Sequence, residues 1–461
     1  MEGMSISFEL RHVDLGDPRL DQRFVKLVED FARRPGIGIP EACGDWAATK
    51  AAYRFMNHPK IDPAALRLAS AHDAAAAWPD DGVVLMAQDT TSLDYTAHPS
   101  VRGLGPMTPP SRRGFFLHST LAVTDDGVPF GLLDQRSWVR DDDPTRVRKP
   151  RRKRELHEKE SKRWVEALAA AEAAAPPDRP IITVADREAD IYDVFAAPRR
   201  AGHDLIIRIR GNRVVDAPEH LLGAAVAAAP VGGTMVVEIG RGDERPPRTA
   251  VLTLKWVALN MAPPVNRRGR ARLPHPAVTI VLAEELAAPE GQEPIRWLLA
   301  ATLAVESAAD AERTVRRYSP RWLVERFHYT LKSGFKVEEL RLGTAAALDR
   351  AATVFSAAAW RVMRLAYEAR TRPDRPCVDI LTPEQAAVLA ATVPNRDRSS
   401  PPLSLGEAVI AVAKLGGFLA RKSDGAPGVK TLWRGLKALD ERVEGYRAAV
   451  FDICGKPVGN S

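Results

Sequence analysis

Residues 181 to 209 contain the apolar run Ile181-Ile-Thr-Val-Ala185, the polar run Asp186-Arg-Glu-Ala-Asp190 and then the apolar run Leu205-Ile-Ile-Arg-Ile209. Both apolar runs have the length and the β-branched composition of strands that are buried in a sheet. The residues between them, near Ala189 to Ala197, have helical spacing. Alternating strand and helix predict an α/β fold.

The segment before this unit carries further strand signals. Val83-Val-Leu-Met-Ala87 predicts a strand that ends at Gln88-Asp89. Residues 115–123 and 128–133 predict a hairpin that turns at Asp125-Asp-Gly127. Three strands followed by alternating helix and strand predict one mixed sheet.

The rest of the chain divides by composition and period. We expect a helical unit over residues 1–80 and a mixed α/β unit over residues 81–370, interrupted by a β-strand insertion at about 211–294. Pro-rich and polar stretches near Arg372–Pro376 and Pro394–Pro402 predict a linker, which makes residues 371–461 a linker followed by helices.

Composition narrows the functional class. The 461 residues carry a formal net charge of +7, which favours a polyanionic partner, most commonly nucleic acid. No apolar run approaches the roughly 20 residues of a membrane span, and Met1 to Arg11 lacks the features of a signal peptide. Cys43, Cys377 and Cys454 form no C-x-x-C pair, so neither a zinc site nor a disulfide framework is expected, and the reducing cytoplasm is the default compartment.

Two aspartates follow apolar strands at equivalent places. Asp89 and Asp186 each stand where a strand is expected to end, and sites in α/β proteins assemble at strand ends. Capping of the next helix is the alternative role for each of them. Together with Glu325 they supply three carboxylates, and carboxylate oxygens are the ligands that Mg²⁺ or Mn²⁺ prefer.

Glu325 lies in the segment Tyr318-Ser-Pro-Arg321-Trp-Leu-Val-Glu325-Arg-Phe-His328-Tyr-Thr-Leu-Lys332. At about 100° per residue, Arg321, Glu325 and Lys332 share a stripe about 40° wide, opposite an apolar face. Ser319 and Pro320 predict the start of this helix, with Tyr318 just outside it. A carboxylate between two cations suits a metal beside a phosphate that the cations hold, although a solvated face with ion pairs fits the same spacing.

Other catalytic motifs are missing from the sequence. We find no G-x-x-x-x-G-K-[ST] loop, no G-x-G-x-x-G between strand and helix, and no G-x-S-x-G nucleophile. Glycoside hydrolysis by two carboxylates stays open on carboxylates alone, but it does not explain the basic charge or the cations beside Glu325.

The chain resembles the bacterial DDE transposases of the IS-four family, and within it the Tn-five (IS-fifty) type. Its signature Y-x2-R-x3-E-x6-K is met by Tyr318, Arg321, Glu325 and Lys332. Further matches are Gln88-Asp-Thr-Thr-Ser-Leu93, Asp186-Arg-Glu-Ala-Asp-Ile191, Leu15-Gly-Asp-Pro-Arg19, Ala52-Tyr-Arg-Phe55, Glu160-Ser-Lys162, Trp297-Leu-Leu299 and Ala413-Lys-Leu-Gly-Gly-Phe418.

The resemblance implies an RNase H-like catalytic domain with a β insertion, a helical N-terminal DNA-binding domain and a helical C-terminal dimerisation domain. It implies that Asp89, Asp186 and Glu325 form a catalytic triad that binds Mg²⁺, or Mn²⁺ in its place. The implied DNA-binding residues are Tyr318, Arg321, Lys332, Trp297, His328, Arg208, Arg54, Arg19 and Arg23, with Trp297 stacking on a flipped base.

The implied activity is cut-and-paste transposition by a homodimer acting on the terminal inverted repeats and on target DNA, in a bacterial cytoplasm at the nucleoid. Strand nicking, hairpin formation, hairpin opening and strand transfer would use one site. The alternative is a catalytically silent DNA-binding protein or inhibitor derived from a transposase. Arg326 and Asn57-His58 depart from the family pattern, and the basic tract Arg146–Arg154 has no counterpart in it.

Overall fold

The helices and strands come from a computed structural model. It describes residue 10 and residues 12–142, 154–239, 248–265, 267, 269–396, 400–421 and 424–454. Of the basic tract Arg146–Arg154, only Arg154 is among the described residues, and of the segment Met1–Arg11 only Leu10 is.

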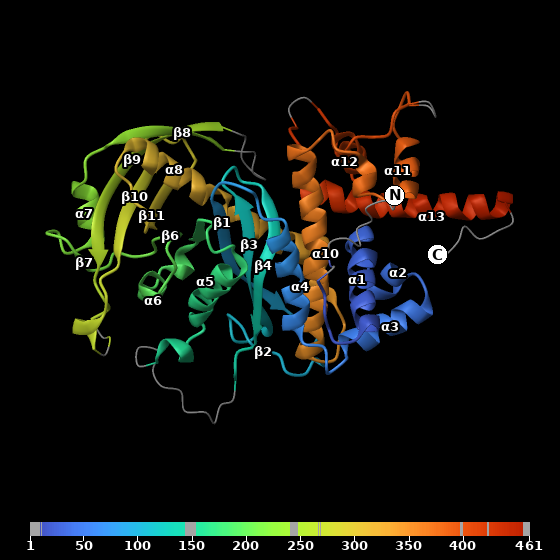
Figure 1. The fold of residues 1–461 in the computed structure, drawn as a ribbon, viewed down its shortest axis with the longest axis horizontal. Helices are drawn as coiled ribbons and strands as arrows, with labels where there is room; N and C mark the ends of the chain where they lie inside the picture. The colour runs from blue at the N-terminus through green and yellow to red at the C-terminus, as the bar shows by residue number, and fades with distance from the viewer. Residues whose placement is uncertain are drawn as a thin grey trace.

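Helices dominate both ends of the chain and strands its middle (Figure 1). The helices are α1 (Pro18–Arg33), α2 (Ile39–Cys43), α3 (Trp46–Met56), α4 (Pro63–Ala76), α5 (Lys162–Ala174), α6 (Tyr192–Ala196), α7 (Leu222–Ala228), α8 (Ala308–Tyr318), α9 (Trp322–Tyr329), α10 (Ala345–Thr371), α11 (Pro383–Ala390), α12 (Leu405–Leu415) and α13 (Val429–Cys454). The strands are β1 (Val84–Asp94), β2 (Gly105–Pro106), β3 (Arg113–Thr124), β4 (Pro129–Trp138), β5 (Ile181–Ala185), β6 (His203–Arg208), β7 (Val215–Asp216), β8 (Gly233–Ile239), β9 (Arg248–Met261), β10 (Ala277–Glu285) and β11 (Arg296–Ala301).

One mixed sheet contains all of these strands. Its order is β2-β3-β1-β5-β6-β11-β10-β9-β7, with β4 on β3 and β8 on β9. β1, β5 and β6 run parallel, whereas the other pairings are antiparallel. The predicted mixed sheet is therefore confirmed. The expected β insertion does not form a separate sheet, because β11 pairs with β6 and carries β10 and β9 onto the same edge.

β1 is longer than the sequence predicted. The expected end at Gln88-Asp89 is wrong, because β3 pairs with β1 as far as Asp94. What ends there is the parallel pairing with β5, whose last pair is Gln88 with Ala185. Asp89 therefore stands inside a strand, at the point where its neighbour on one side stops.

α10 is the central helix of the molecule. Most of its side chains are buried, which indicates a helix enclosed on nearly all sides. Figure 1 shows it between the sheet and the N-terminal helices α1 to α3, with α13 crossing above them. No helix in the described part of the chain is both long enough and apolar enough to span a membrane.

The segment that carries Glu325 is more continuous than expected. α8 ends at Tyr318, and a 3₁₀ turn over Ser319–Arg321 leads straight into α9. The prediction that Ser319 and Pro320 start a new helix is wrong, because the Ser319 hydroxyl instead donates to the Val315 carbonyl of α8. The predicted apolar face is confirmed, since Leu323, Val324, Phe327, Leu331 and Phe335 are all buried.

The crossing of α12 and α13 depends on glycine. A Cβ atom at Gly435 would lie 1.8 Å from the Val412 carbonyl oxygen, and one at Gly416 would lie 1.9 Å from the Thr431 carbonyl oxygen. These distances are far below any real contact, so the two helices touch through their backbones.

We expect Gly435→Ala to lower the midpoint of thermal unfolding, because overpacking a helix contact costs about 1–3 kcal/mol. Gly445→Ala on the same helix is the matched control, since nothing lies within 4 Å of its added Cβ. The control should gain about 0.5–1 kcal/mol, the helical preference of Ala over Gly. Equal unfolding midpoints for the two variants would show that the close crossing is absent.

Candidate active site

The parallel pairing of β1 with β5 brings two aspartates together. Gln88 and Ala185 form the last pair, so Asp89 and Asp186 are the next residues on neighbouring strands. Paired strands lie about 5 Å apart, and matched positions on them direct their side chains to the same face. The two carboxylates, predicted from sequence to converge, therefore leave the sheet side by side.

Negative charge accumulates around Asp186. Burial raises the pKa of its carboxyl, and the nearby carboxylates of Asp89 and Glu325 raise it further. The backbone N–H of Glu188 donates to Asp186 Oδ1 at 2.9 Å and partly offsets this effect. Asp186 also caps the short turn Arg187–Ala189, so capping, the alternative role, is present as well.

Glu325 faces this edge from α9 and is half exposed. Its carboxylate forms an ion pair with Arg321, one turn earlier on the same face. The ion pair that the helical spacing allowed is therefore present between Arg321 and Glu325, whereas Lys332 pairs with Glu338 outside the stripe. The stripe also interacts with the acidic edge. Glu325 raises the pKa of Asp186, and Asp89 raises the pKa of Arg321.

Within the described ranges, no three His, Cys, Asp or Glu side chains are gathered closely enough to hold a metal ion. The donor set at this edge is nevertheless of the right chemistry, because Asp89, Asp186 and Glu325 supply hard carboxylate oxygens. Arg321 holds Glu325 through Oε1, so its guanidinium competes with a cation for this carboxylate.

A cluster of aromatic and cationic side chains lies beside the carboxylates. The ring centroids of Trp297 and Tyr318 are 5.9 Å apart, and the Arg321 guanidinium lies 5.8 Å from the Tyr318 ring. Arg208 on β6 is next to β11, and its Nη2 donates to the Arg296 carbonyl at 3.2 Å. The structure therefore brings Trp297, Tyr318, Arg321 and Arg208 together.

Three polar atoms of this cluster are buried and meet no acceptor or donor in good hydrogen-bond geometry among the described residues, although the Tyr318 and Arg321 side chains also act on each other. They are Tyr318 Oη, Arg321 Nε and Arg321 Nη1. Burial raises the pKa of Tyr318, so its hydroxyl keeps its proton and can donate it. Although burial opposes the charge of Arg321, its bond to Glu325 and the nearby Tyr318 and Asp89 raise its pKa, and it stays cationic.

Lys332 and His328 are held by the protein itself. Lys332 Nζ donates to the Ser92 carbonyl at 3.0 Å and forms an ion pair with Glu338 at 3.1 Å. His328 is only 4% exposed, with Nε2 3.1 Å from Ser119 Oγ and Nδ1 3.5 Å from Asp89 Oδ2. This position suits His328 to holding the Asp89 carboxylate in place. Its contact with DNA stays a prediction.

Arg19, Arg23 and Arg54 belong to the N-terminal helices. Arg19 pairs with Asp17 and keeps 87% of its side chain exposed, and Arg54 is exposed on α3. Figure 1 places α1 and α3 across α10 from β6 and β11, so one chain does not bring these arginines to the carboxylates.

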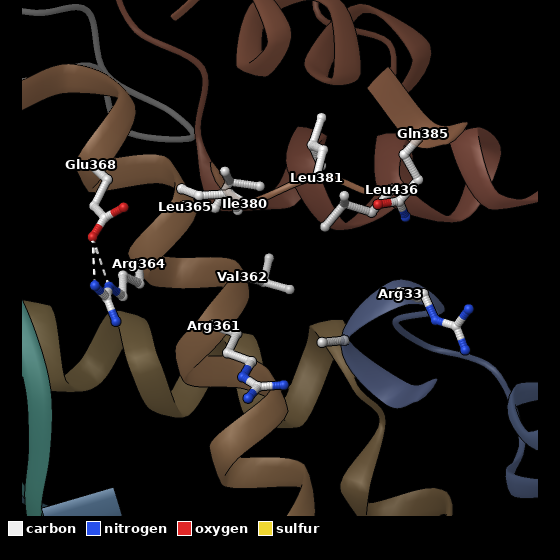
Figure 2. A pocket seen from close by; sticks show the side chains of 11 residues that line it. Arg33, Arg361, Val362, Arg364, Leu365, Glu368, Ile380, Leu381, Gln385 and Leu436 are labelled. Carbon is white, nitrogen blue, oxygen red and sulfur yellow. Dashed lines mark hydrogen bonds and ion pairs between the residues drawn. The ribbon is translucent and has the colours of Figure 1, made fainter. Parts of the chain in front are cut away.

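A small pocket lies where the N-terminal and C-terminal helices meet α10. Figure 2 shows its lining, in which Val362 and Leu365 of α10 lie near Ile380, Leu381 and Leu436 of α13. None of the predicted site residues lines it.

Comparison with known families gives three matches along the chain. Residues 6–61 match the family described as transposase DNA-binding, residues 143–359 match the transposase DDE domain, and residues 357–452 match the transposase Tn5 dimerisation domain. The chain belongs to the DDE transposases of the Tn5 type. As a transposase of this type it binds DNA, forms a homodimer and has an RNase H-like catalytic fold, and its family uses divalent metal ions.

The matched DDE region contains Asp186 and Glu325 but begins after Asp89. The place of Asp89 in the transposase site therefore depends on the β1–β5 register and on the motif around it. Membership in this family also removes the carbohydrate hydrolase alternative.

Two charged residues that the sequence did not single out lie beside the aspartates of the candidate site. Glu188 lies near both aspartates, and its carboxylate is bound by Arg163 of α5. The available signals were the acidic motif, which contains Glu188, and the Glu160-Ser-Lys162 match, which ends one residue before Arg163. Nothing in the sequence indicated that these motifs meet.

Proposed function

We propose that this transposase moves DNA by a cut-and-paste reaction, with Asp89, Asp186 and Glu325 holding Mg²⁺, or Mn²⁺ in its place. The proposal rests on the β1–β5 register, which sets Asp89 beside Asp186, together with the acidic field that raises the pKa of Asp186. Bound divalent ions would activate a water or a 3′-hydroxyl and stabilise the leaving oxygen of an in-line phosphoryl transfer.

We further propose that a phosphate of the transposon end binds between Tyr318 and Arg321. A buried donor without an acceptor costs about 1–3 kcal/mol, so three of them in one place favour an anionic ligand. Lys332 would hold the same strand, and Trp297 would stack on a base displaced beside that phosphate. Arg208, whose charge is felt at Tyr318, adds positive potential.

The proposed reaction follows from the roles of these side chains, which hold the DNA strand and the metal ions. The cations fix the backbone of one strand against the acidic edge, where a water cuts it and leaves a 3′-hydroxyl. That hydroxyl attacks the opposite strand to form a hairpin, a second water opens the hairpin, and the freed 3′-hydroxyl joins target DNA. Each step is the same in-line displacement at phosphorus, which is why one site can serve all four.

We propose the domain limits given by the sequence patterns. Residues 1–80 bind the inverted repeat, with Arg19, Arg23 and Arg54 toward DNA. Residues 81–370 form the catalytic domain, with the insertion at about 211–294, and residues 371–461 provide the dimer contact. The matched regions support this order, although the dimerisation match begins at residue 357, inside α10.

The test is incubation of the purified protein with DNA that carries the element's inverted repeats. We expect nicks and hairpins with Mg²⁺ or Mn²⁺, complete loss of both with EDTA, and recovery when the metal is returned. Binding of the DNA ends should weaken steeply as salt is raised, since released counterions drive phosphate binding.

End binding without nicking in either metal would favour the alternative, a catalytically silent DNA-binding protein or inhibitor. Cleavage that persists in EDTA would contradict the role of the three carboxylates.

A further inference from the structure

We propose that Arg163 is a positioning residue that sets the spacing between Asp89 and Asp186. The inference rests on the proposed function, because it gives these two carboxylates a shared metal. Arg163 belongs to α5, which carries none of the site residues expected from the sequence.

The guanidinium of Arg163 bonds to three different segments. Its Nε donates to Thr90 Oγ1 at 2.9 Å, its Nη2 donates to Glu188 Oε2 at 2.6 Å, and its Nη1 donates to the Glu160 carbonyl at 3.1 Å. The first two partners come from the two acidic motifs, which are almost 100 residues apart in the sequence. Arg163 therefore ties the two motifs together with one rigid, planar group.

Each of these two partners, Thr90 and Glu188, is directly connected to one of the carboxylates proposed to bind metal. Thr90 follows Asp89 directly in β1, beyond the last pair that β1 makes with β5. Glu188 donates its backbone N–H to Asp186 Oδ1 at 2.9 Å. Since β5 ends at Ala185, backbone pairing no longer fixes the distance between the two segments at this point, and the Thr90–Arg163–Glu188 bridge does.

Arg163 is itself held in place. Its guanidinium carbon lies 5.2 Å from the Trp138 ring and 5.2 Å from the Trp164 ring, and only 12% of its side chain is exposed. The Thr90 hydroxyl is also 2.9 Å from Nδ1 of the fully buried His118. Since the Thr90 oxygen accepts from Arg163, its hydroxyl proton is free to be donated to His118.

This environment separates Arg163 from a DNA-binding arginine. Its donors are used inside the protein, and two indole rings and the chain around it cover the guanidinium. A positioning role requires the fork of an arginine, because one ammonium group cannot span Thr90 and Glu188 with the same two-sided geometry. The conservative change to Lys is therefore informative, as it keeps the charge and most of the volume.

The first measurement is a titration of the DNA-free protein with Mn²⁺, which gives its affinity for the metal. We expect Arg163→Lys to weaken Mn²⁺ binding about 10- to 100-fold, the usual loss when a group that orients metal ligands is removed. Binding of end DNA and the unfolding midpoint should stay close to those of the wild type. Thr90→Val, which removes one acceptor without touching the charge, should weaken Mn²⁺ binding in the same direction.

The two changes should not add. If Arg163 acts through Thr90, the double variant Thr90→Val with Arg163→Lys should bind Mn²⁺ about as weakly as Arg163→Lys alone. Arg136→Ala is the matched control, because Arg136 also bonds to α5, through Glu166, and reaches neither acidic motif. It should leave Mn²⁺ binding unchanged.

The possible failures are distinguishable. Wild-type protein that binds no Mn²⁺, even with end DNA present, would overturn the proposed function and the inference with it. Wild-type binding that Arg163→Lys leaves unaltered would overturn the inference alone. Weaker end binding with unchanged Mn²⁺ affinity would make Arg163 a DNA contact and would also reject the positioning role.

Discussion

Glu325→Ala should abolish nicking of transposon-end DNA and leave binding of that DNA intact. Glu325 is half exposed, and within the described chain it is bound only to Arg321. Truncating it therefore removes a partner from Arg321 alone. The proposed metal contribution to phosphoryl transfer is several kcal/mol, which corresponds to a rate loss of about 10³-fold or more.

The measurement is single-turnover nicking at saturating Mg²⁺, with end binding followed by fluorescence anisotropy in Ca²⁺. Glu312→Ala is a matched control, because Glu312 forms the same kind of one-turn ion pair, with Arg316 on α8, away from the acidic edge. The control should nick at the wild-type rate. Nicking by Glu325→Ala at that rate would refute the assignment of Glu325, and loss of end binding would show that the residue supports the DNA contact instead.

Short-range patterns predicted much of this fold. The strand Ile181–Ala185 was predicted with its observed limits, and the helical spacing of residues 348–370 matches α10. Both have strong local signals, an apolar β-branched run in one case and uninterrupted helical spacing in the other. The Pro-rich region was harder, because α11, with Thr382 as its N-cap, forms between the two stretches from which a linker was predicted.

The site was predictable as far as its motifs are local. Arg321 and Glu325 are one turn apart, so helical spacing was enough to place them together. The position of Lys332 was harder to predict, because the chain forms a π-helical turn over Thr330–Gly334 that shifts the regular helical spacing. The contact of Arg163 with Thr90 and Glu188 depends on how α5 packs on the sheet, and no periodicity within one segment encodes that packing.

Arg321→Ala should weaken binding of end DNA and, at the same time, strengthen binding of Mn²⁺ to the DNA-free protein. Truncating one partner of a buried, hydrogen-bonded charge pair costs about 2–5 kcal/mol, so end binding should fall on the order of 10²-fold. Mn²⁺ binding should rise because the guanidinium that now occupies Glu325 competes with any cation at the acidic edge.

The sign of the second effect follows from linkage between the two ligands. In the wild type, a phosphate that engages the free Nε and Nη1 donors of Arg321 draws the guanidinium away from Glu325, which releases a carboxylate for the metal. DNA and metal should then each raise the affinity for the other by the same factor, typically about 5- to 150-fold. Without the Arg321 side chain that factor should fall toward one.

Paired titrations decide between this coupling and a simple loss of charge. Mn²⁺ affinity is measured with and without end DNA in the wild type, in Arg321→Ala and in Arg317→Ala. Arg317 is the control, because it lies near the end of the neighbouring helix α8 and holds a different carboxylate, that of Asp125, through two hydrogen bonds. The control should keep the wild-type coupling factor. If Arg321→Ala also keeps it, the ion pair with Glu325 does not gate the metal, and the unassembled carboxylates of the DNA-free protein must be held apart by something other than Arg321.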